Sequence, residues 1–125
     1  MIFGIGTDIV HVDRMRDSLE KHGDKFARRI LTEPEFSEFS DKQDKAAFLA
    51  KRFAAKEATA KAMGTGFSQG LSLRHIGVKH DEAGKPLLEF LDVAEEFLHD
   101  NNIKQMHLSL ADERDYAVAF VTLVL

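Results

Sequence analysis

The sequence has no cysteine, only two prolines and no long uninterrupted hydrophobic run. Without cysteine the chain can form no disulfide, no thiolate nucleophile and no cysteine-ligated zinc site, so we expect it to fold in a reducing cytoplasm. The longest apolar run, residues 117–125, contains a threonine and is too short to cross a bilayer, and the N-terminus lacks the pattern of a signal peptide. These absences exclude a disulfide-stapled secreted protein and predict that the chain has no membrane segment.

An excess of basic charge is also missing. The chain carries 17 basic and 21 acidic residues, a net charge of −4, which argues against a general nucleic-acid binder. The basic residues are nevertheless concentrated in two segments. Residues 11–31 contain six basic and four acidic residues, and residues 42–61 contain six basic and two acidic residues. Such segments are either solvated helix faces or surfaces for an anionic small molecule or an acidic partner.

The length and the apolar content of 44% predict one globular domain covering residues 1–125. Hydrophobic periodicity and turn signals predict strands over residues 2–10, 76–80, 86–91, 106–111 and 116–125. They also predict helices over residues 12–30 with a break near Gly23, 32–39, 44–63, and 92–98 with Asp92 as its cap. The final strand is almost wholly apolar, so we expect it to be buried on both faces.

The first predicted strand has one nearly bare face. Gly4, Gly6 and Asp8 alternate along that face, and the opposite face is expected to carry the larger side chains of Phe3, Ile5, Thr7 and Ile9. Glycine weakens a strand, so two glycines in front of a carboxylate suggest that another element or a ligand comes close to this face.

The long helix over residues 44–63 places a carboxylate in an apolar stripe. Leu49, Phe53, Glu57 and Lys61 stand four residues apart and therefore share one side of the helix. If this side packs on the bare strand face, Glu57 meets Asp8, and two carboxylates with open positions for water and phosphate oxygens are typical of a Mg²⁺ site. The alternative is a simple Glu57–Lys61 pair, with Asp8 capping a turn.

Other familiar motifs are absent or weak. The glycines of residues 4–9 fit neither the dinucleotide fingerprint nor a Walker loop, and no histidine spacing matches a zinc protease. Gly64 and Gly66 follow the long helix, where a C-cap is the ordinary role. His107 and Ser109 share a strand face, where His107 either faces solvent or contacts an anion; a triad with Asp112 is only weakly supported.

Five segments together resemble a known enzyme family. They are residues 4–10 (GIGTDIV), 52–58 (RFAAKEA) with Lys61, 64–66 (GTG), 84–86 (GKP) and 107–116 (HLSLADERDY). In this order and spacing, over essentially the whole chain, they resemble the small 4′-phosphopantetheinyl transferases of the holo-[acyl-carrier-protein] synthase type. The resemblance implies an α+β fold in which a mostly antiparallel curved sheet packs against the long helix, with the N-terminal helices over one end.

The resemblance also implies a reaction and a site. The phosphopantetheine arm of coenzyme A is transferred with Mg²⁺ to a serine of apo-acyl carrier protein, releasing adenosine 3′,5′-bisphosphate and supporting fatty acid biosynthesis. Asp8 and Glu57 are implied to bind the metal, Lys61 to contact the coenzyme A phosphates, and Glu35, a metal-bound water or Glu57 to act as the base. The residues implied to surround the nucleotide part are Arg52, Gly64, Thr65, Gly66, Lys85, Pro86 and His107.

The uneven charge then has two expected uses, a polyanionic cofactor and an acidic partner protein. The acidic recognition helix of the carrier protein is implied to meet the first basic segment at Arg14, Met15, Lys21, Lys25, Phe26 and Arg29. The family also implies homotrimers with sites between subunits. Two other functions remain open from the residues alone: a non-catalytic module that binds an acidic helical protein, and a Mg²⁺-dependent nucleotide phosphohydrolase.

Overall fold

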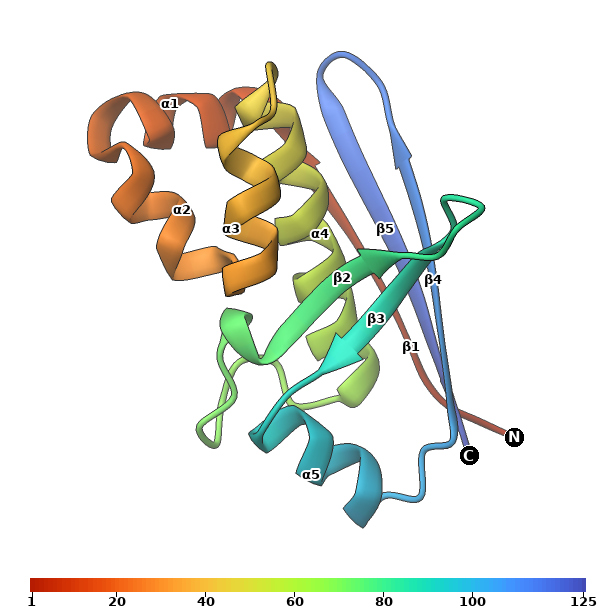
Figure 1. Cartoon of the computed structure of the whole chain (residues 1–125). Helices are drawn as coiled ribbons and strands as arrows, with labels where there is room; N and C mark the ends of the chain where they lie inside the picture. Colours follow the sequence, from red (N-terminus) through yellow and green to blue (C-terminus); the bar gives the residue numbers. More distant parts are fainter.

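The computed structural model describes residues 1–125 and has the α+β fold that was predicted (Figure 1). Every predicted element is present, with ends that differ by at most one or two residues. The elements in chain order are β1 (Ile2–His11), α1 (Val12–His22), α2 (Asp24–Ile30), α3 (Glu33–Ser40), α4 (Lys45–Met63), the 3₁₀ helix η1 (Leu73–His75), β2 (Ile76–His80), β3 (Pro86–Phe90), α5 (Val93–Asp100), β4 (Gln105–Asp112) and β5 (Tyr116–Val124).

All strand pairs are antiparallel, and they form two sheets. One sheet has the order β1-β5-β4, and the other is the β2–β3 hairpin. Helix α4 packs against β1 and β5, while α1 to α3 gather beside one end of α4 and α5 lies towards the other end of the molecule (Figure 1). No helix is long and apolar enough to cross a membrane.

The face of β1 without large side chains lies directly under α4. A Cβ atom on Gly4 would collide with the carbonyl oxygen of Ala62, and one on Gly6 would collide with the carbonyl oxygen of Ala58. The predicted close approach of another element is therefore confirmed, and that element is the long helix. Glycine is required here because any side chain would separate the helix from the strand.

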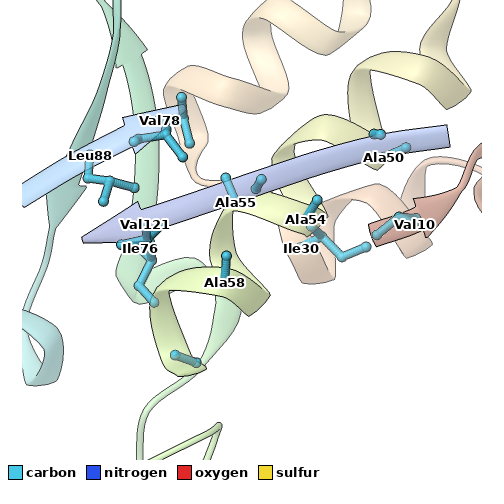
Figure 2. Close-up of a cluster of buried hydrophobic side chains, with 14 of the residues drawn as sticks. Val10, Ile30, Ala50, Ala54, Ala55, Ala58, Ile76, Val78, Leu88 and Val121 are labelled. Atoms are coloured by element: carbon cyan, nitrogen blue, oxygen red, sulfur yellow. The ribbon is translucent and has the colours of Figure 1, made fainter. Parts of the chain in front are cut away.

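The helix also presents small side chains to the central strand. Ala54, Ala55 and Ala58 are fully buried, and Figure 2 shows them beside Val121 of β5. Alanine favours the helix and leaves room for close packing, so α4 lies near the sheet along much of its length. The last turns of α4 lie over β1 in the same way, and there Lys61 bonds Asp8.

The expectation that the last strand is buried on both faces is wrong for the isolated chain. On the face of β5 toward α4, Ala117, Ala119, Val121 and Leu123 are fully buried, whereas Tyr116 and Phe120 on the other face are about half exposed. Ile5 and Ile9 of β1 share this outer face and are also exposed. The three-stranded sheet therefore has one covered face and one uncovered, largely apolar face.

Phe3 departs from the predicted alternation of β1. A register irregularity between Ile2 and Gly4 shifts the strand pairing, and the Phe3 ring packs edge-on against Phe97 of α5 with ring centroids 5.9 Å apart. The ideal two-residue period that predicted its position does not extend through such a bulge.

Local capping signals are confirmed at one helix and wrong at another. At α3, the Thr32 hydroxyl accepts a hydrogen bond from the Glu35 backbone N–H, and the Glu35 carboxylate accepts one from the Thr32 N–H. Before α5, the Asp92 side chain makes no capping bond, and its backbone has a φ of 49°. A capping residue normally has an extended backbone, so Asp92 is not placed to cap this helix.

A buried ion pair joins α4 to three other elements. The Lys56 ammonium donates to Glu35 Oε1 at 2.7 Å and to the carbonyl oxygens of Leu73 and Ile76, while Glu35 Oε2 accepts the Val78 N–H at 2.7 Å. Both charged side chains are at most 2% exposed. Burial lowers the pKa of Lys56, and the Glu35 charge opposes that shift. The pair connects α3, α4, η1 and β2 at one point.

Candidate active site

Asp8 and Lys61 meet where β1 passes under the last turns of α4. The Lys61 ammonium donates to Asp8 Oδ1 and to the Thr7 carbonyl oxygen, both at 3.0 Å. The Asp8 side chain is 16% exposed and that of Lys61 is 53% exposed. The strand thus offers two oxygen atoms to a cation at the edge of the sheet.

Glu57 belongs to the same cluster, one helical turn before Lys61. Its pKa is raised, first by partial burial and then by the charge of Asp8, while Lys61 and Arg14 partly offset the rise. The charge of Asp8 thus acts on Glu57, and Asp8 bonds Lys61 one helical turn further along α4, so both carboxylates lie where α4 faces β1. Glu57 continues the stripe of Phe53, as the four-residue spacing predicted.

The chemistry of this donor set fits a hard divalent cation. No group of three or more acidic or histidine side chains is arranged to hold a metal ion anywhere in the chain. Mg²⁺ does not require one, because proteins often bind it through one or two carboxylates and leave its other positions to water and substrate phosphates. Asp8, Glu57 and the Thr7 carbonyl supply oxygen atoms only, and an ammonium group already bonds two of them.

A second polar region is a pocket of about 490 Å³ beyond the N-terminal half of α4. Arg52 and Pro86, two of the residues that the resemblance implied to surround the nucleotide, line this pocket together with Gly84, Lys42, Lys51 and His80. Nearby cations and partial burial lower the pKa of His80, with burial the larger cause. Asp44 and Asp112 also line the pocket, but Lys42, Lys51 and Arg52 outnumber them, so its net charge is positive and we call it the basic pocket.

Arg52 is the most constrained group in this pocket. It is 4% exposed, lies over the Phe48 ring and donates to Glu38, yet its Nε atom has no hydrogen-bond partner. Burial lowers its pKa, although Glu35 and Glu38 oppose the shift. A buried donor without a partner is costly, and this Nε is the one buried side-chain polar atom of the chain that lacks a partner.

The β2–β3 turn carries Lys85 and Pro86 in a defined shape. Asp81 Oδ1 accepts the backbone N–H groups of Ala83 and Lys85, both at 2.9 Å, and Gly84 has a φ of 87°. This left-handed conformation is one that glycine adopts without strain. The turn therefore holds Pro86 at the rim of the basic pocket.

The remaining predicted nucleotide residues lie elsewhere. Gly64 ends α4 in the left-handed conformation, which confirms its C-cap role, and Thr65 and Gly66 continue the turn beside Lys61. His107 lies with Ser109 on the face of β4 that points away from α4. Within one chain, His107 therefore faces away from the Asp8 and Glu57 cluster.

The predicted partner surface is present only in part. Arg14, Lys21, Lys25 and Arg29 are exposed on α1 and α2, but Met15 is 1% exposed and belongs to the core, and Phe26 is half-buried against it. Arg14 lies 5.4 Å from the centre of the Phe53 ring, beside the Glu57 stripe. The basic surface thus extends from α2 to the edge of the carboxylate cluster.

Glu35 lies apart from that cluster. It is 2% exposed, and its two oxygens already accept bonds from Lys56, Thr32 and Val78. Its contacts are those of a group that holds elements together, and none of them involves Asp8 or Glu57.

Comparison with known proteins now places this geometry in a family. The model of the 4′-phosphopantetheinyl transferase superfamily matches residues 4–121. The chain belongs to this superfamily. The transferase is 56% identical over 124 residues to the holo-[acyl-carrier-protein] synthase of Nitrosococcus oceani, a match that covers 99% of this chain and 80% of that protein.

Solved structures agree with the fold of this 4′-phosphopantetheinyl transferase. The holo-[acyl-carrier-protein] synthase of Neisseria meningitidis is 45% identical and superposes with a TM-score of 0.95, with both chains covered completely. The enzyme of Bacillus anthracis, solved in complex with CoA (3′,5′-ADP), is 38% identical with a TM-score of 0.81 over 98% of this chain and 96% of that one. The fold predicted from the motifs is confirmed.

Proposed function

We propose that this chain is a holo-[acyl-carrier-protein] synthase, which transfers 4′-phosphopantetheine from coenzyme A to a serine of apo-acyl carrier protein. The family membership supports the reaction class, and the cluster of Asp8, Glu57 and Lys61 is the observation that locates it. Holo-acyl carrier protein and adenosine 3′,5′-bisphosphate are the products, and the holo-protein serves fatty acid biosynthesis in the cytoplasm.

The proposed chemistry is displacement at phosphorus. The serine oxygen of the carrier protein forms the new phosphodiester bond, and the bond to the bridging pyrophosphate oxygen breaks as the bisphosphate leaves. Asp8 and Glu57 would hold Mg²⁺, which would neutralise negative charge on the pyrophosphate. Lys61 contacts the same phosphates, so positive charge faces the oxygen on which charge develops.

The serine proton needs an acceptor, and we assign this role to the Glu57 oxygen that a bound metal would leave free, rather than to Glu35. Glu57 lies in the carboxylate cluster and is only partly buried, whereas both oxygens of Glu35 are already bonded in the interior. An acceptor must come within hydrogen-bond reach of the proton, and geometry takes precedence over acidity in choosing it.

The basic pocket around Arg52 is proposed to bind the remaining phosphate of coenzyme A, with Lys85 and Pro86 beside the nucleotide. Replacing Arg52 by methionine keeps apolar bulk but removes the donor, so we expect the KM for coenzyme A to rise about tenfold or more, with kcat within about twofold. Steady-state kinetics measure both, and Lys104→Met, an exposed charge on the far loop, is the control. An unchanged KM in a folded Arg52→Met variant contradicts this assignment.

We also propose a homotrimer with active sites between subunits. Asp8 and Leu110 both pair with Ala119 of β5, so the carboxylate cluster and the basic pocket lie at opposite edges of one sheet with α4 over the strand between them. A cyclic contact that joins the β1 edge of one subunit to the β4 edge of the next brings the carboxylate cluster of one subunit next to the basic pocket of the other. It also lets His107 reach a neighbouring site and gives the exposed apolar sheet face a partner.

This assembly predicts a specific disruption. Replacing Phe120, which is 46% exposed on the outer sheet face, by glutamate places charge in the interface, and we expect the trimer to dissociate to monomer. Light scattering during size-exclusion chromatography measures the mass, and Glu95→Gln on α5 is the control. A wild-type protein that is already monomeric contradicts the proposal.

The acidic carrier protein is proposed to dock on the exposed basic side chains of α1 and α2, next to Arg14. Opposite charge there steers association and fixes orientation. The basic segment thus leads the serine-bearing partner to the carboxylate cluster.

Intact-mass spectrometry tests the whole proposal. Apo-acyl carrier protein is incubated with this protein, coenzyme A and Mg²⁺, and in parallel with a chelator. We expect a mass increment of one phosphopantetheine only when the divalent cation is present. Binding of carrier protein without any increment favours a non-catalytic module, and release of adenosine bisphosphate without carrier protein favours a phosphohydrolase.

A further inference from the structure

Lys61 occupies a position on the strand that a metal ion is proposed to share. Its ammonium bonds Asp8 Oδ1 and the Thr7 carbonyl oxygen, which are two of the oxygen atoms that β1 offers to a cation. The same lysine is proposed to contact the coenzyme A phosphates, so it has two anionic partners, the Asp8 carboxylate and the phosphates.

These two roles compete for one ammonium group. A lysine has three N–H donors, and two of them already point to β1 in this structure. A divalent cation at Asp8 would share that carboxylate with Lys61, and two cations on one carboxylate repel each other. Binding the metal and holding Lys61 in its present position are therefore mutually unfavourable.

The Lys61 side chain is free to change position, in contrast to Lys56, the other lysine of the motif. Its side chain is 53% exposed, so its ammonium can turn toward solvent or toward a ligand without breaking buried contacts. Lys56 is fully buried and bonds three acceptors, so it is fixed. Burial thus separates a structural lysine from an exchangeable one.

We propose that Lys61 is an exchangeable counter-ion: it neutralises Asp8 before the divalent cation binds, and metal binding releases it toward the phosphates of coenzyme A. The inference rests on the proposed function for its metal and its phosphates. It makes the enzyme's affinity for the metal lower than the two carboxylates alone would give. It also makes the contribution of Lys61 to coenzyme A binding depend on the metal.

The test is the affinity for Mn²⁺ in the absence of coenzyme A, measured from free Mn²⁺ by electron paramagnetic resonance. Replacing Lys61 by methionine removes the competing cation, and we expect Mn²⁺ to bind at least about fivefold more tightly. Lys61→Gln is a second neutral variant, and the exposure of this side chain predicts that both variants fold. Arg14→Met is the matched control, because Arg14 also faces Glu57 but makes no bond to Asp8, and its effect is expected to be smaller.

A second measurement follows the released lysine. Calorimetry measures the binding of coenzyme A to the wild type and to Lys61→Met, each with and without Mg²⁺. We expect Mg²⁺ to strengthen coenzyme A binding more in the wild type than in Lys61→Met. The exchange is overturned if both Lys61 variants bind Mn²⁺ no more tightly than a wild type that transfers phosphopantetheine. That result leaves the proposed function intact. A wild type with neither Mn²⁺ binding nor transfer overturns both.

Discussion

Replacing Asp8 by asparagine is expected to slow phosphopantetheine transfer by at least about a hundredfold. Removing an outer partner of a metal ligand already costs about 10- to 100-fold in metal affinity or activity, and Asp8 is proposed as a direct ligand. Asparagine keeps the size of the side chain and removes its charge. The initial rate of the mass increment on acyl carrier protein measures the effect, and Asp100→Asn, an exposed carboxylate on α5, is the matched control.

The same variant separates an enzyme from a binding module. Asp8 lies on β1 under α4, whereas the proposed docking side chains lie on α1 and α2. The Asp8→Asn variant should therefore still bind apo-acyl carrier protein with nearly unchanged affinity. Transfer at the wild-type rate by a folded Asp8→Asn protein would falsify the assignment of the metal site. Loss of carrier binding together with transfer would instead place Asp8 in the docking surface.

Replacing Gly6 by alanine is expected to lower the free energy of unfolding by about 3 kcal/mol or more. The added Cβ collides with the Ala58 carbonyl oxygen and lies 2.7 Å from the Ala62 backbone nitrogen, so the obstacle is the backbone of α4. A helix backbone cannot move aside as a flexible side chain can. Relief requires α4 to move off β1, which also separates Glu57 from Asp8.

Urea unfolding at a fixed protein concentration measures this loss, and Gly77→Ala is the matched control. Gly77 is also a buried strand glycine, but a Cβ there meets the Glu89 and Thr32 side chains at 3.3 Å and 3.4 Å, and these can adjust. We expect its effect to be clearly smaller. A Gly6→Ala protein within about 0.5 kcal/mol of the wild type contradicts the close helix contact.

The pattern of the sequence predicted those features that depend on neighbours along the chain. The long helix, its glycine C-cap and the capping box at Thr32 are local, and their residues interact within a turn or two. The meeting of Asp8 and Glu57 was also predictable, because a bare strand face and a charged position in an apolar helix stripe each required a partner.

Features that depend on distant segments were not predictable in this way. Lys56 and Glu35 are 21 residues apart, and nothing in their spacing shows that they form a buried pair. Lys42 and His80 meet in one pocket only because α4 lies beside the β2–β3 turn. Met15 is different, because its spacing with Val12 and Leu19 already predicted the apolar stripe of an amphipathic helix. The resemblance nevertheless assigned it to the partner surface, and the fold buries it.

The buried Lys56–Glu35 pair has a consequence for the direction in which Glu57 points. Successive residues on an α-helix are about 100° apart around its axis, so the anchored Lys56 side chain sets the rotation of α4 and, with it, the orientation of its neighbour Glu57. A rotation that turned Glu57 away from Asp8 would pull Lys56 from its three acceptors. The direction of the proposed catalytic carboxylate is thus held by an ion pair on another side of the same helix, where both charged groups are buried.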